Sequence, residues 1–348
     1  HRGCAVVLPP GHRAHVVAGA AATTTFRDAP AGHDVRSVSW WQYDGAAPVV
    51  TFPGAPGRTA GVVRLPVRIT DDTAPLGGLT VTCLLDGKPT ADCRTGFAAT
   101  LAAGTHTLTV TARDAHGRST TASHRWIVDT APPVVSVATL PGVALVPKLT
   151  LSYAATDPAG VGSYDVRYRR ANFSDAGFSA LVIPAGWAGT REGSRSLTMA
   201  PGYEYCLSVR ARDTVGNVSA WSSERCTAMP LDDRAMVRTT AGWSQVASVG
   251  TYANTTTVTT SRGAALARPS AQGRRFAVVA TTCPTCGSLD VFLGSTRIGS
   301  VSLVAPTTRV RQVLFLPVQA SVRAGTVTLR TTSTGRRVTV DALLVRKR

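Results

Sequence analysis

A short phrase built on Arg-Asp, with a glycine close behind it, occurs three times in the chain. The copies are Arg27-Asp28-Ala29-Pro30-Ala31-Gly32, Arg113-Asp114-Ala115-His116-Gly117 and Arg212-Asp213-Thr214-Val215-Gly216. Each copy is followed, after a few polar residues, by tryptophan: Trp40 and Trp41, then Trp126, then Trp221. The aspartates of successive copies lie 86 and 99 residues apart, which fits the length of one two-sheet β-sandwich. The repeat therefore predicts a row of similar modules rather than one large domain.

Within each repeat, apolar and polar residues alternate, as in residues 63–69, 107–110 and 206–210. A period of two places one face of a strand in a core and the other in water. The runs are short and end in turn-forming pairs such as Asp86-Gly87 and Gly216-Asn217. With 32 Gly, 21 Pro and only 16% charged residues, the chain is poorly suited to helical bundles or coiled coils. We predict an all-β fold, and no apolar run is long enough for a membrane span.

Prolines mark the expected module boundaries. We place them near Pro48, Pro132 and Pro230, because proline cannot continue a strand ladder. The expected modules are residues 1–47, 48–131, 132–230 and 231–348. The first is half a module and the chain opens with His1, so we expect a piece of a longer protein. Each sandwich is expected to use its apolar residues for its own core.

The second module carries a set of short phrases. They are Cys83-Leu84-Leu85-Asp86-Gly87, then Cys93, then residues 101–108, then Arg113-Asp114 and Trp126-Ile127-Val128-Asp129. These phrases are similar to a bacterial Ig-like repeat that is common in secreted actinobacterial proteins. The resemblance implies that Cys83 pairs with Cys93 across a hairpin. Residues 1–47 look like the second half of the same module, with Cys4 in the position of Cys93, so the partner of Cys4 would lie upstream.

The third module has a different pattern in its second half: Leu197, Pro201-Gly202-Tyr203-Glu204-Tyr205, Val209, Ala211 and Trp221-Ser222. This pattern resembles fibronectin type III, and Tyr205 stands four residues before Val209, where a tyrosine corner is expected. His106 occupies the matching place before Val110, so we interpret His106 as structural rather than catalytic. Cys206 and Cys226 flank the last hairpin, which would allow them to bridge neighbouring strands.

The last module carries another set of phrases: Leu231-Asp232-Asp233-Arg234, Gly242-Trp243, Cys283-Pro284-Thr285-Cys286-Gly287 and Val340-Asp341-Ala342-Leu343-Leu344-Val345. They are similar to a C-terminal β-rich module of actinobacterial extracellular proteins, some of which carry cell-wall amidase or other hydrolase domains upstream. The resemblance implies a jelly-roll-like sandwich, an architecture that many carbohydrate-binding modules share. Trp243 and Tyr252 are the rings that could form a ligand platform, and packing in the core or at an edge is the alternative.

The seven cysteines form three close pairs and leave Cys4 over. Cys283 and Cys286 could instead form a redox centre or half of a zinc site. A redox motif should open a helix, whereas residues 288–293 have a strand pattern. Zinc needs a second pair of ligands, and no histidine follows Cys286. We predict three structural disulfides, Cys83–Cys93, Cys206–Cys226 and Cys283–Cys286, and therefore an extracellular location, secreted or associated with the cell wall.

The net charge of +17 suggests nucleic acid as a partner. However, 34 of the 37 basic residues are arginines, and most of the excess lies after Leu231. There the arginines are scattered through strand segments, with few aromatic residues that could stack on bases. We predict no nucleic-acid partner and favour a monomer. A solvated surface is the simplest interpretation, and the remaining candidate partner is a cell-wall glycan or another anionic surface polymer.

Motifs for catalysis are scarce. The sequence has no Gly-x-Ser-x-Gly elbow, no His-Glu-x-x-His and no Walker loop. All seven histidines precede residue 125, and none has metal-ligand spacing. Asp157, Asp165 and Asp213 are candidate calcium ligands, but calcium needs six or more oxygens. We expect no catalytic residues, no cofactor and no metal, with calcium near these three residues left open.

These observations together predict a non-catalytic extracellular spacer or adhesion segment of a secreted or cell-surface protein. The alternative is a carbohydrate- or cell-wall-binding accessory region of a secreted hydrolase, such as a peptidoglycan amidase, whose catalytic domain lies upstream. A hydrolytic site within the chain is a third hypothesis, and any such site would have to be assembled from residues far apart in the sequence.

Overall fold

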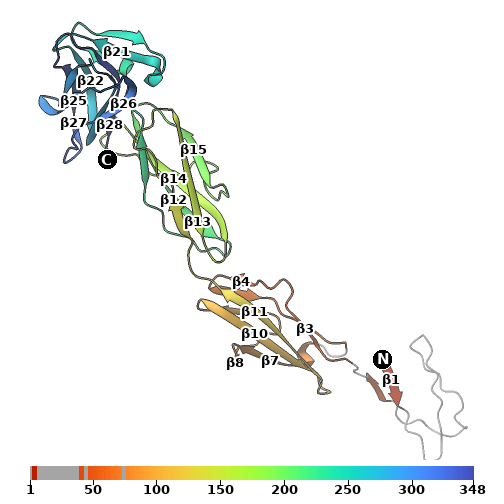
Figure 1. Cartoon of the computed structure of the whole chain (residues 1–348). Coiled ribbons are helices and arrows are strands. Elements are labelled where there is room, and N and C mark those ends of the chain that lie inside the picture. The colour runs from red at the N-terminus through yellow and green to blue at the C-terminus, as the bar shows by residue number, and fades with distance from the viewer. Residues whose placement is uncertain (1, 6–38, 43–45, 73–75) are drawn as a thin grey trace, which may run out of the picture. The chain divides into compact units, whose positions relative to one another are not determined.

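The computed structural model describes residues 2–5, 39–42, 46–72 and 76–348, and it is built almost wholly from β-strands (Figure 1). The helices among these residues are three 3-10 turns of three residues each. None of them is long and apolar enough to span a membrane. The chain divides into two compact units, His1–Thr130 and Ala131–Arg348. The prediction of an all-β chain of tandem sandwiches is confirmed.

The first unit contains one sandwich, which we call the first sandwich. Its main sheet has the order β4-β11-β10-β7-β8, and the pairs β3–β6 and β5–β9 provide further strands. Val63, Leu108 and Trp126 are almost fully buried in one shared core. The elements are β3 (Val49–Thr51), β4 (Arg58–Thr59), β5 (Val62–Leu65), β6 (Arg68–Thr70), η1 (Leu76–Gly78), β7 (Thr80–Leu85), β8 (Lys88–Pro89), β9 (Phe97–Thr100), β10 (Gly104–Arg113) and β11 (Ser119–Val128).

Ahead of this sandwich, β1 (Arg2–Ala5) and β2 (Ser39–Gln42) form an antiparallel pair, in which the backbone of Cys4 lies opposite Trp40. Most of the expected half module, residues 1–47, lies outside the described residues. Its resemblance to an Ig-like module and the upstream partner of Cys4 therefore stay predictions.

The second unit begins with a sandwich of two three-stranded sheets, which we call the middle sandwich. The sheet orders are β12-β13-β15 and β14-β16-β17. Leu151, Val166, Leu207 and Val209 are fully buried between them, as the alternation in the sequence requires. The strands are β12 (Val134–Val137), β13 (Lys148–Thr156), β14 (Val161–Asn172), β15 (Ser194–Thr198), β16 (Tyr203–Asp213) and β17 (Arg225–Ala228).

The same unit ends with a larger sandwich, which we call the terminal sandwich. One sheet has the order β20-β21-β28-β23-β26, with β18 also paired to β28, and the other has the order β19-β22-β27-β24-β25. The elements are β18 (Leu231–Asp232), η2 (Asp233–Ala235), β19 (Val237–Arg238), β20 (Ser244–Ala247), η3 (Tyr252–Asn254), β21 (Thr255–Thr259), β22 (Ala265–Gly273), β23 (Arg275–Thr282), β24 (Ser288–Leu293), β25 (Thr296–Ser302), β26 (Arg309–Phe315), β27 (Arg323–Thr331) and β28 (Val338–Arg346).

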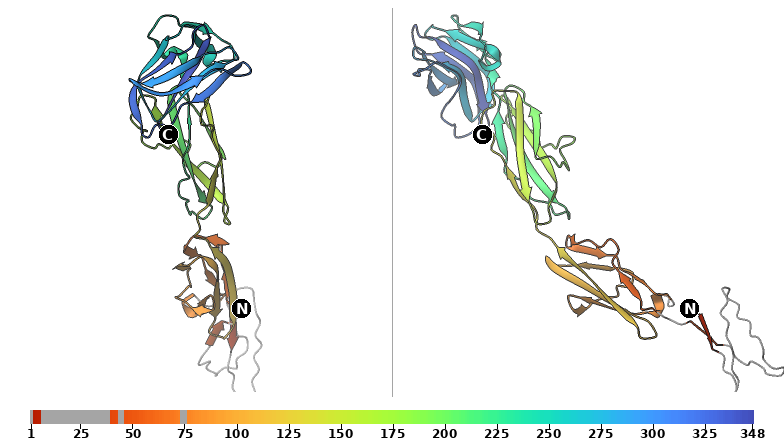
Figure 2. Two further views of the ribbon diagram at one scale, coloured as in Figure 1. Left: turned by 60° about the vertical axis from the view of Figure 1, so that its left-hand side comes forward. Right: turned by 45° about the vertical axis from the view of Figure 1, so that its right-hand side comes forward.

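All nine residues of β28 are buried. Val340 and Leu343 belong to the core of the terminal sandwich, whereas Ala342 packs with the core of the middle sandwich. The register between β28 and β23 shifts so that Asp341 is left without a partner residue, which is the geometry of a β-bulge. β28 is thus a strand with an apolar environment on both faces. Both views in Figure 2 show the middle and terminal sandwiches in contact.

Candidate functional site

Each of the three sandwiches carries one disulfide. Cys83 is bonded to Cys93, Cys206 to Cys226, and Cys283 to Cys286. Cys206 and Cys226 lie directly opposite each other on β16 and β17, whereas Cys286 is followed, after Gly287, by strand β24 rather than by a helix. In each of the three pairs, the two sulfur atoms are therefore bonded to each other.

The expected ligand platform needs correction. Trp243 is only 7% exposed and belongs to the core of the terminal sandwich. Tyr252 is 2% exposed, and its hydroxyl donates to the carbonyl of Pro230 at 2.9 Å. Neither ring presents a face on which a sugar could stack. Trp243 is a core residue, and Tyr252 packs at the contact between the middle and terminal sandwiches.

The three candidate calcium ligands separate into a pair and a single residue. Asp157 and Asp213 have carboxylate oxygens within 4.8 Å of each other. One oxygen of Asp213 accepts hydrogen bonds from the backbone N–H groups of Val215, Gly216 and Asn217, so it organises the turn of the repeated phrase. Asp165 instead accepts from Arg210 and from the backbone of Gly189. The sequence left calcium near these residues open, and this arrangement leaves it open as well.

His106 joins two parts of the first sandwich. Its Nε2 lies 3.0 Å from the carbonyl of Ala102 and its Nδ1 lies 2.8 Å from the carboxylate of Asp86. Both partners are acceptors, so the ring satisfies both only when both nitrogens carry protons. The hydrogen bond to Asp86 accordingly raises the pKa of His106, and the same bond lowers the pKa of Asp86.

Tyr205 makes a similar contact in the middle sandwich, because its hydroxyl accepts from the backbone N–H of Ala200 at 3.1 Å. The two residues therefore tie their strands to the chain a few residues upstream, as their matching sequence positions suggested. In these contacts His106 has a structural role.

The middle and terminal sandwiches share buried apolar surface. Phe173 of the middle sandwich belongs to the core of the terminal sandwich, and Val279 and Ala342 of the terminal sandwich belong to the core of the middle one. Ala228 packs with Ala277 and Leu344 in a further cluster. The expectation that each sandwich fills only its own core is therefore wrong for these two.

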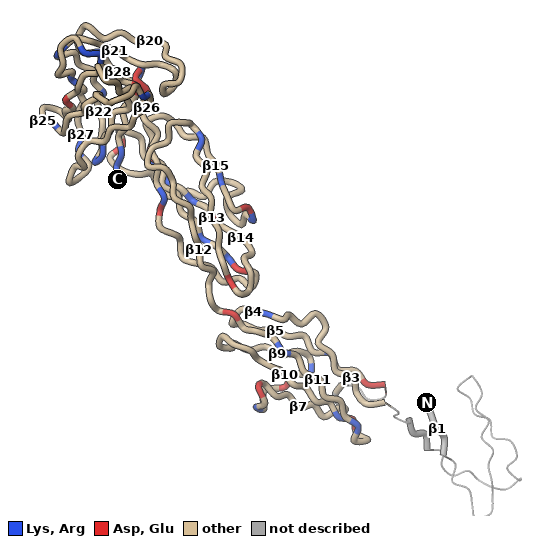
Figure 3. The backbone as a smooth tube through the Cα atoms, in the orientation of Figure 1, with Lys and Arg blue, Asp and Glu red and all other residues tan. Residues whose placement is uncertain are grey.

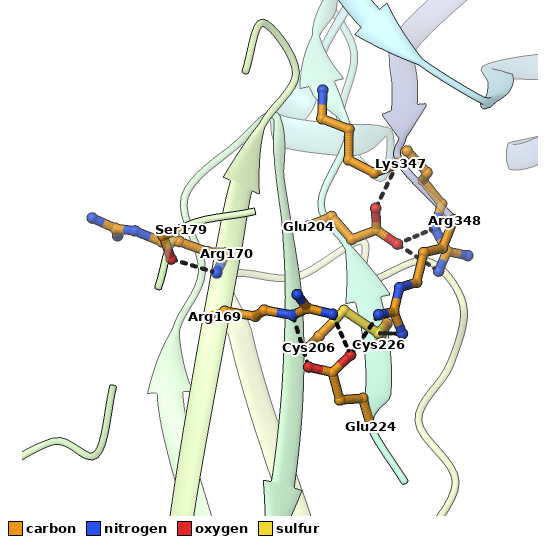
Figure 4. Close-up of a disulfide and its surroundings, with 10 residues drawn as sticks. Arg169, Arg170, Ser179, Glu204, Cys206, Glu224, Cys226, Lys347 and Arg348 are labelled. Atoms are coloured by element: carbon orange, nitrogen blue, oxygen red, sulfur yellow. Dashed lines mark hydrogen bonds and ion pairs between the residues drawn. A yellow bond between two sulfur atoms is a disulfide. The ribbon is translucent and has the colours of Figure 1, made fainter. Parts of the chain in front are cut away.

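A buried ion pair lies in the same contact. Glu204 of β16 is 1% exposed and accepts from Nε and Nη2 of Arg346 at 3.0 and 2.9 Å. Its other oxygen accepts from the backbone N–H of Lys347 at 2.7 Å, and Figure 4 shows Lys347 beside Glu204. The ammonium group of Lys347 donates to the carbonyls of Phe173 and Gln272, one on each sandwich. Burial lowers the pKa of Lys347. Every charge here has a partner across the contact, as buried charges require.

The outer face of the β14-β16-β17 sheet carries a group of stacked cations, which we call the arginine face. It consists of Asp165, Arg167, Arg169, Phe178, Arg210, Arg212, Trp221, Glu224 and Arg348. The guanidinium carbons of Arg167 and Arg210 lie 4.0 and 4.8 Å from the centre of the Trp221 ring. Arg169 and Arg348 both contact Phe178 and both form ion pairs with Glu224, beside the Cys206–Cys226 disulfide (Figure 4).

Two carboxylates balance part of this charge. Burial tends to raise the pKa of Asp165, but the hydrogen bonds from Gly189 and Arg210 outweigh burial and hold the pKa below its usual range. Five arginines face two carboxylates, so the face keeps an excess of positive charge. Basic residues elsewhere are spread along all three sandwiches (Figure 3), and the arginine face differs from them by the stacking that orders its side chains.

Two hollows on the described surface have the size of small-ligand sites. One, of about 340 Å³, is lined by Val161, Gly162, Tyr164, Arg191 and Thr214. The other, of about 330 Å³, is lined by Val81, Thr82, Cys83, Pro89, Thr90, Asp92 and Arg94. Neither lining places a carboxylate beside an imidazole, the combination that general acid–base hydrolysis would use.

Sequence reasoning missed the contact between the sandwiches and the arginine face. The run from Ala342 to Val345 was a usable signal, because four successive apolar residues in a strand indicate burial on both faces. The spacing of Arg167 and Arg169 also indicated one face of a strand. Nothing in the sequence linked Arg167 to Trp221, which follows β16 and lies more than fifty residues away.

No protein-family model and no curated protein matches the sequence, but solved structures show similarity. Fibronectin III-like modules of Clostridium thermocellum CbhA share 16% identity at a TM-score of 0.32, over 52% of this chain and 94% of theirs. A glucan-utilisation protein of Bacteroides ovatus, in complex with a mixed-linkage heptasaccharide, shares 10% at 0.21, over 86% and 99%. A carbohydrate-binding module of the β-sandwich superfamily shares 10% at 0.22, over 87% and 99%. With TM-scores below 0.5, these likenesses carry no conclusion about a ligand.

Proposed function

We propose that this chain is a non-catalytic extracellular spacer whose middle and terminal sandwiches act as one rigid piece. The observation that carries the proposal is the Glu204–Arg346 pair, buried in apolar surface that both sandwiches share. Relative motion would separate these charges in a poorly solvated environment, which is costly. A connection of this kind holds whatever the chain displays at a fixed distance and angle.

The disulfides support an extracellular location, because bonds of this kind persist outside a reducing cytosol. The alternative role, as a binding region for a hydrolase such as an actinobacterial amidase, loses its candidate platform because Trp243 and Tyr252 are buried. The sequence encoded upstream of residue 1 tests that context directly.

Electron-spin distance measurement tests the rigidity. In a C4S background, nitroxide labels on S152C and S302C, both at exposed strand positions, report across the two sandwiches, and the pair S244C and S302C within the terminal sandwich is the matched control. We expect a single distance distribution as narrow as that of the control. A clearly broader or bimodal distribution across the contact would refute the rigid spacer, and a clearing zone in zymography of the whole chain would refute the absence of catalysis.

A further inference from the structure

Arg167 and Arg210 each have hydrogen-bond donors that are not used within the described part of the protein. Each uses its Nε, which donates to Ser208 Oγ at 3.0 Å in one case and to Asp165 Oδ2 at 2.8 Å in the other. Among the residues that the structure describes, none accepts a hydrogen bond from the Nη atoms of either arginine. Both side chains are half-buried, so the Nη atoms of the two guanidinium groups, which have no acceptor among the described residues, lie at the surface of the sheet.

Trp221 keeps these two guanidinium groups in place. Because both guanidinium groups stack on the same ring, they have already lost much of the freedom that an exposed arginine loses when it binds a ligand. Ser208, which is fully buried beneath Arg167, fixes the guanidinium from below. Ordering of this kind before binding favours affinity.

The geometry of the two guanidinium groups favours one chemical class of ligand. A guanidinium with two free nitrogens pairs best with an oxyanion that offers two oxygens, such as a carboxylate or a sulfate. The guanidinium groups of Arg167 and Arg210 already lie over the Trp221 ring, and a nucleobase would have to compete with them for stacking, which disfavours single-stranded nucleic acid. The arginines follow neighbouring strands of an open sheet rather than line a pocket, which suits an extended polymer.

We propose that the arginine face binds an acidic polysaccharide, whose carboxylate or sulfate groups pair with Arg167 and Arg210. This goes beyond the spacer role. It also places the anionic partner on the middle sandwich, whereas the charge distribution in the sequence had pointed to the terminal segment.

Isothermal titration of the whole chain with polygalacturonate, dextran sulfate and neutral dextran tests the proposal. We expect binding to at least one of the two anionic polymers, weaker at high salt, and none to neutral dextran. R167Q/R210Q should lower the affinity at least about tenfold, since each arginine loses charge-assisted hydrogen bonds. The control R262Q/R336Q removes the same charge from two exposed arginines of the terminal sandwich and should change the affinity less than about twofold.

R167K/R210K separates fork geometry from charge. Lysine keeps the cation over Trp221 but has no planar fork, so we expect most of the affinity to be lost although the net charge is unchanged. This variant carries the test if R167Q/R210Q fails to fold, which thermal unfolding of each variant will show. The proposal is overturned if the control pair loses as much affinity as R167Q/R210Q, if neither anionic polymer binds the wild type at low salt, or if single-stranded DNA displaces both polymers at lower concentration.

Discussion

Replacing Glu204 by glutamine should destabilise the whole second unit. The substitution keeps the size of the side chain but leaves the Arg346 guanidinium, whose side chain is 8% exposed, without its counter-ion. Removing one member of a buried ion pair typically costs 3 to 5 kcal/mol, about 4 here, because the remaining charge stays desolvated. For a unit of this size, 1 kcal/mol corresponds to a shift in Tm of about 2 to 4 °C. We therefore expect E204Q to lower the Tm of the second unit by about 8 to 16 °C.

Differential scanning calorimetry of the full chain measures this effect. The matched control is E192Q, because Glu192 pairs with Arg195 in the same sandwich but is 73% exposed, and an exposed pair contributes about 0 to 1 kcal/mol. The double variant E204Q/R346M removes both charges and should be more stable than E204Q alone. The reasoning fails if E204Q and E192Q have the same Tm, or if E204Q/R346M is no more stable than E204Q.

Raising the pH from about 6 to about 9 should destabilise the first sandwich, since the pKa of His106 is raised on folding and its contribution is lost as the pH passes the folded value; H106Q should remove this dependence in thermal unfolding. Burial raises the pKa of Asp341 to about 6, so stability of the second unit should increase as the pH falls from about 7 to about 5. D341N should be more stable than the wild type at neutral pH by calorimetry, and equal stability there would contradict the assignment. In urea unfolding, C206A/C226A should cost about 3 kcal/mol and C283A/C286A about 2, because the second bond closes a much shorter loop.

The sequence was sufficient for the all-β fold, because alternation and turn residues are local signals that each strand carries for itself. Burial of Leu207 and Val209 followed from the alternation of residues 206–210. Tyr252 was harder, since its ring is buried only because a second sandwich lies against it, and no local pattern encodes that neighbour. Glu204 shows the same limit: a glutamate between two tyrosines gave no indication that its partner lies 142 residues further along the chain.

The arginine face also depends on long-range placement. The strand pattern predicted that Arg167 and Arg210 point outward. Their side chains are ordered because both stack on Trp221, which lies in the loop after β16. Resemblance to fibronectin type III drew attention to this tryptophan without assigning it a role. The charge count was misleading here, because it emphasised the last third of the chain, whereas the pre-ordered cations lie in the middle sandwich.

The contacts of β28 and Lys347 have a consequence for biosynthesis. A chain is synthesised from its N-terminus, so Glu204 and Phe173 emerge long before the residues that cover them. Until Lys347 has followed, the end of the middle sandwich exposes an unfilled apolar surface and a hydrated carboxylate to solvent. Folding of the second unit is thus completed only after β28 and Lys347 have been made, and premature termination within β28 would leave both sandwiches unfinished.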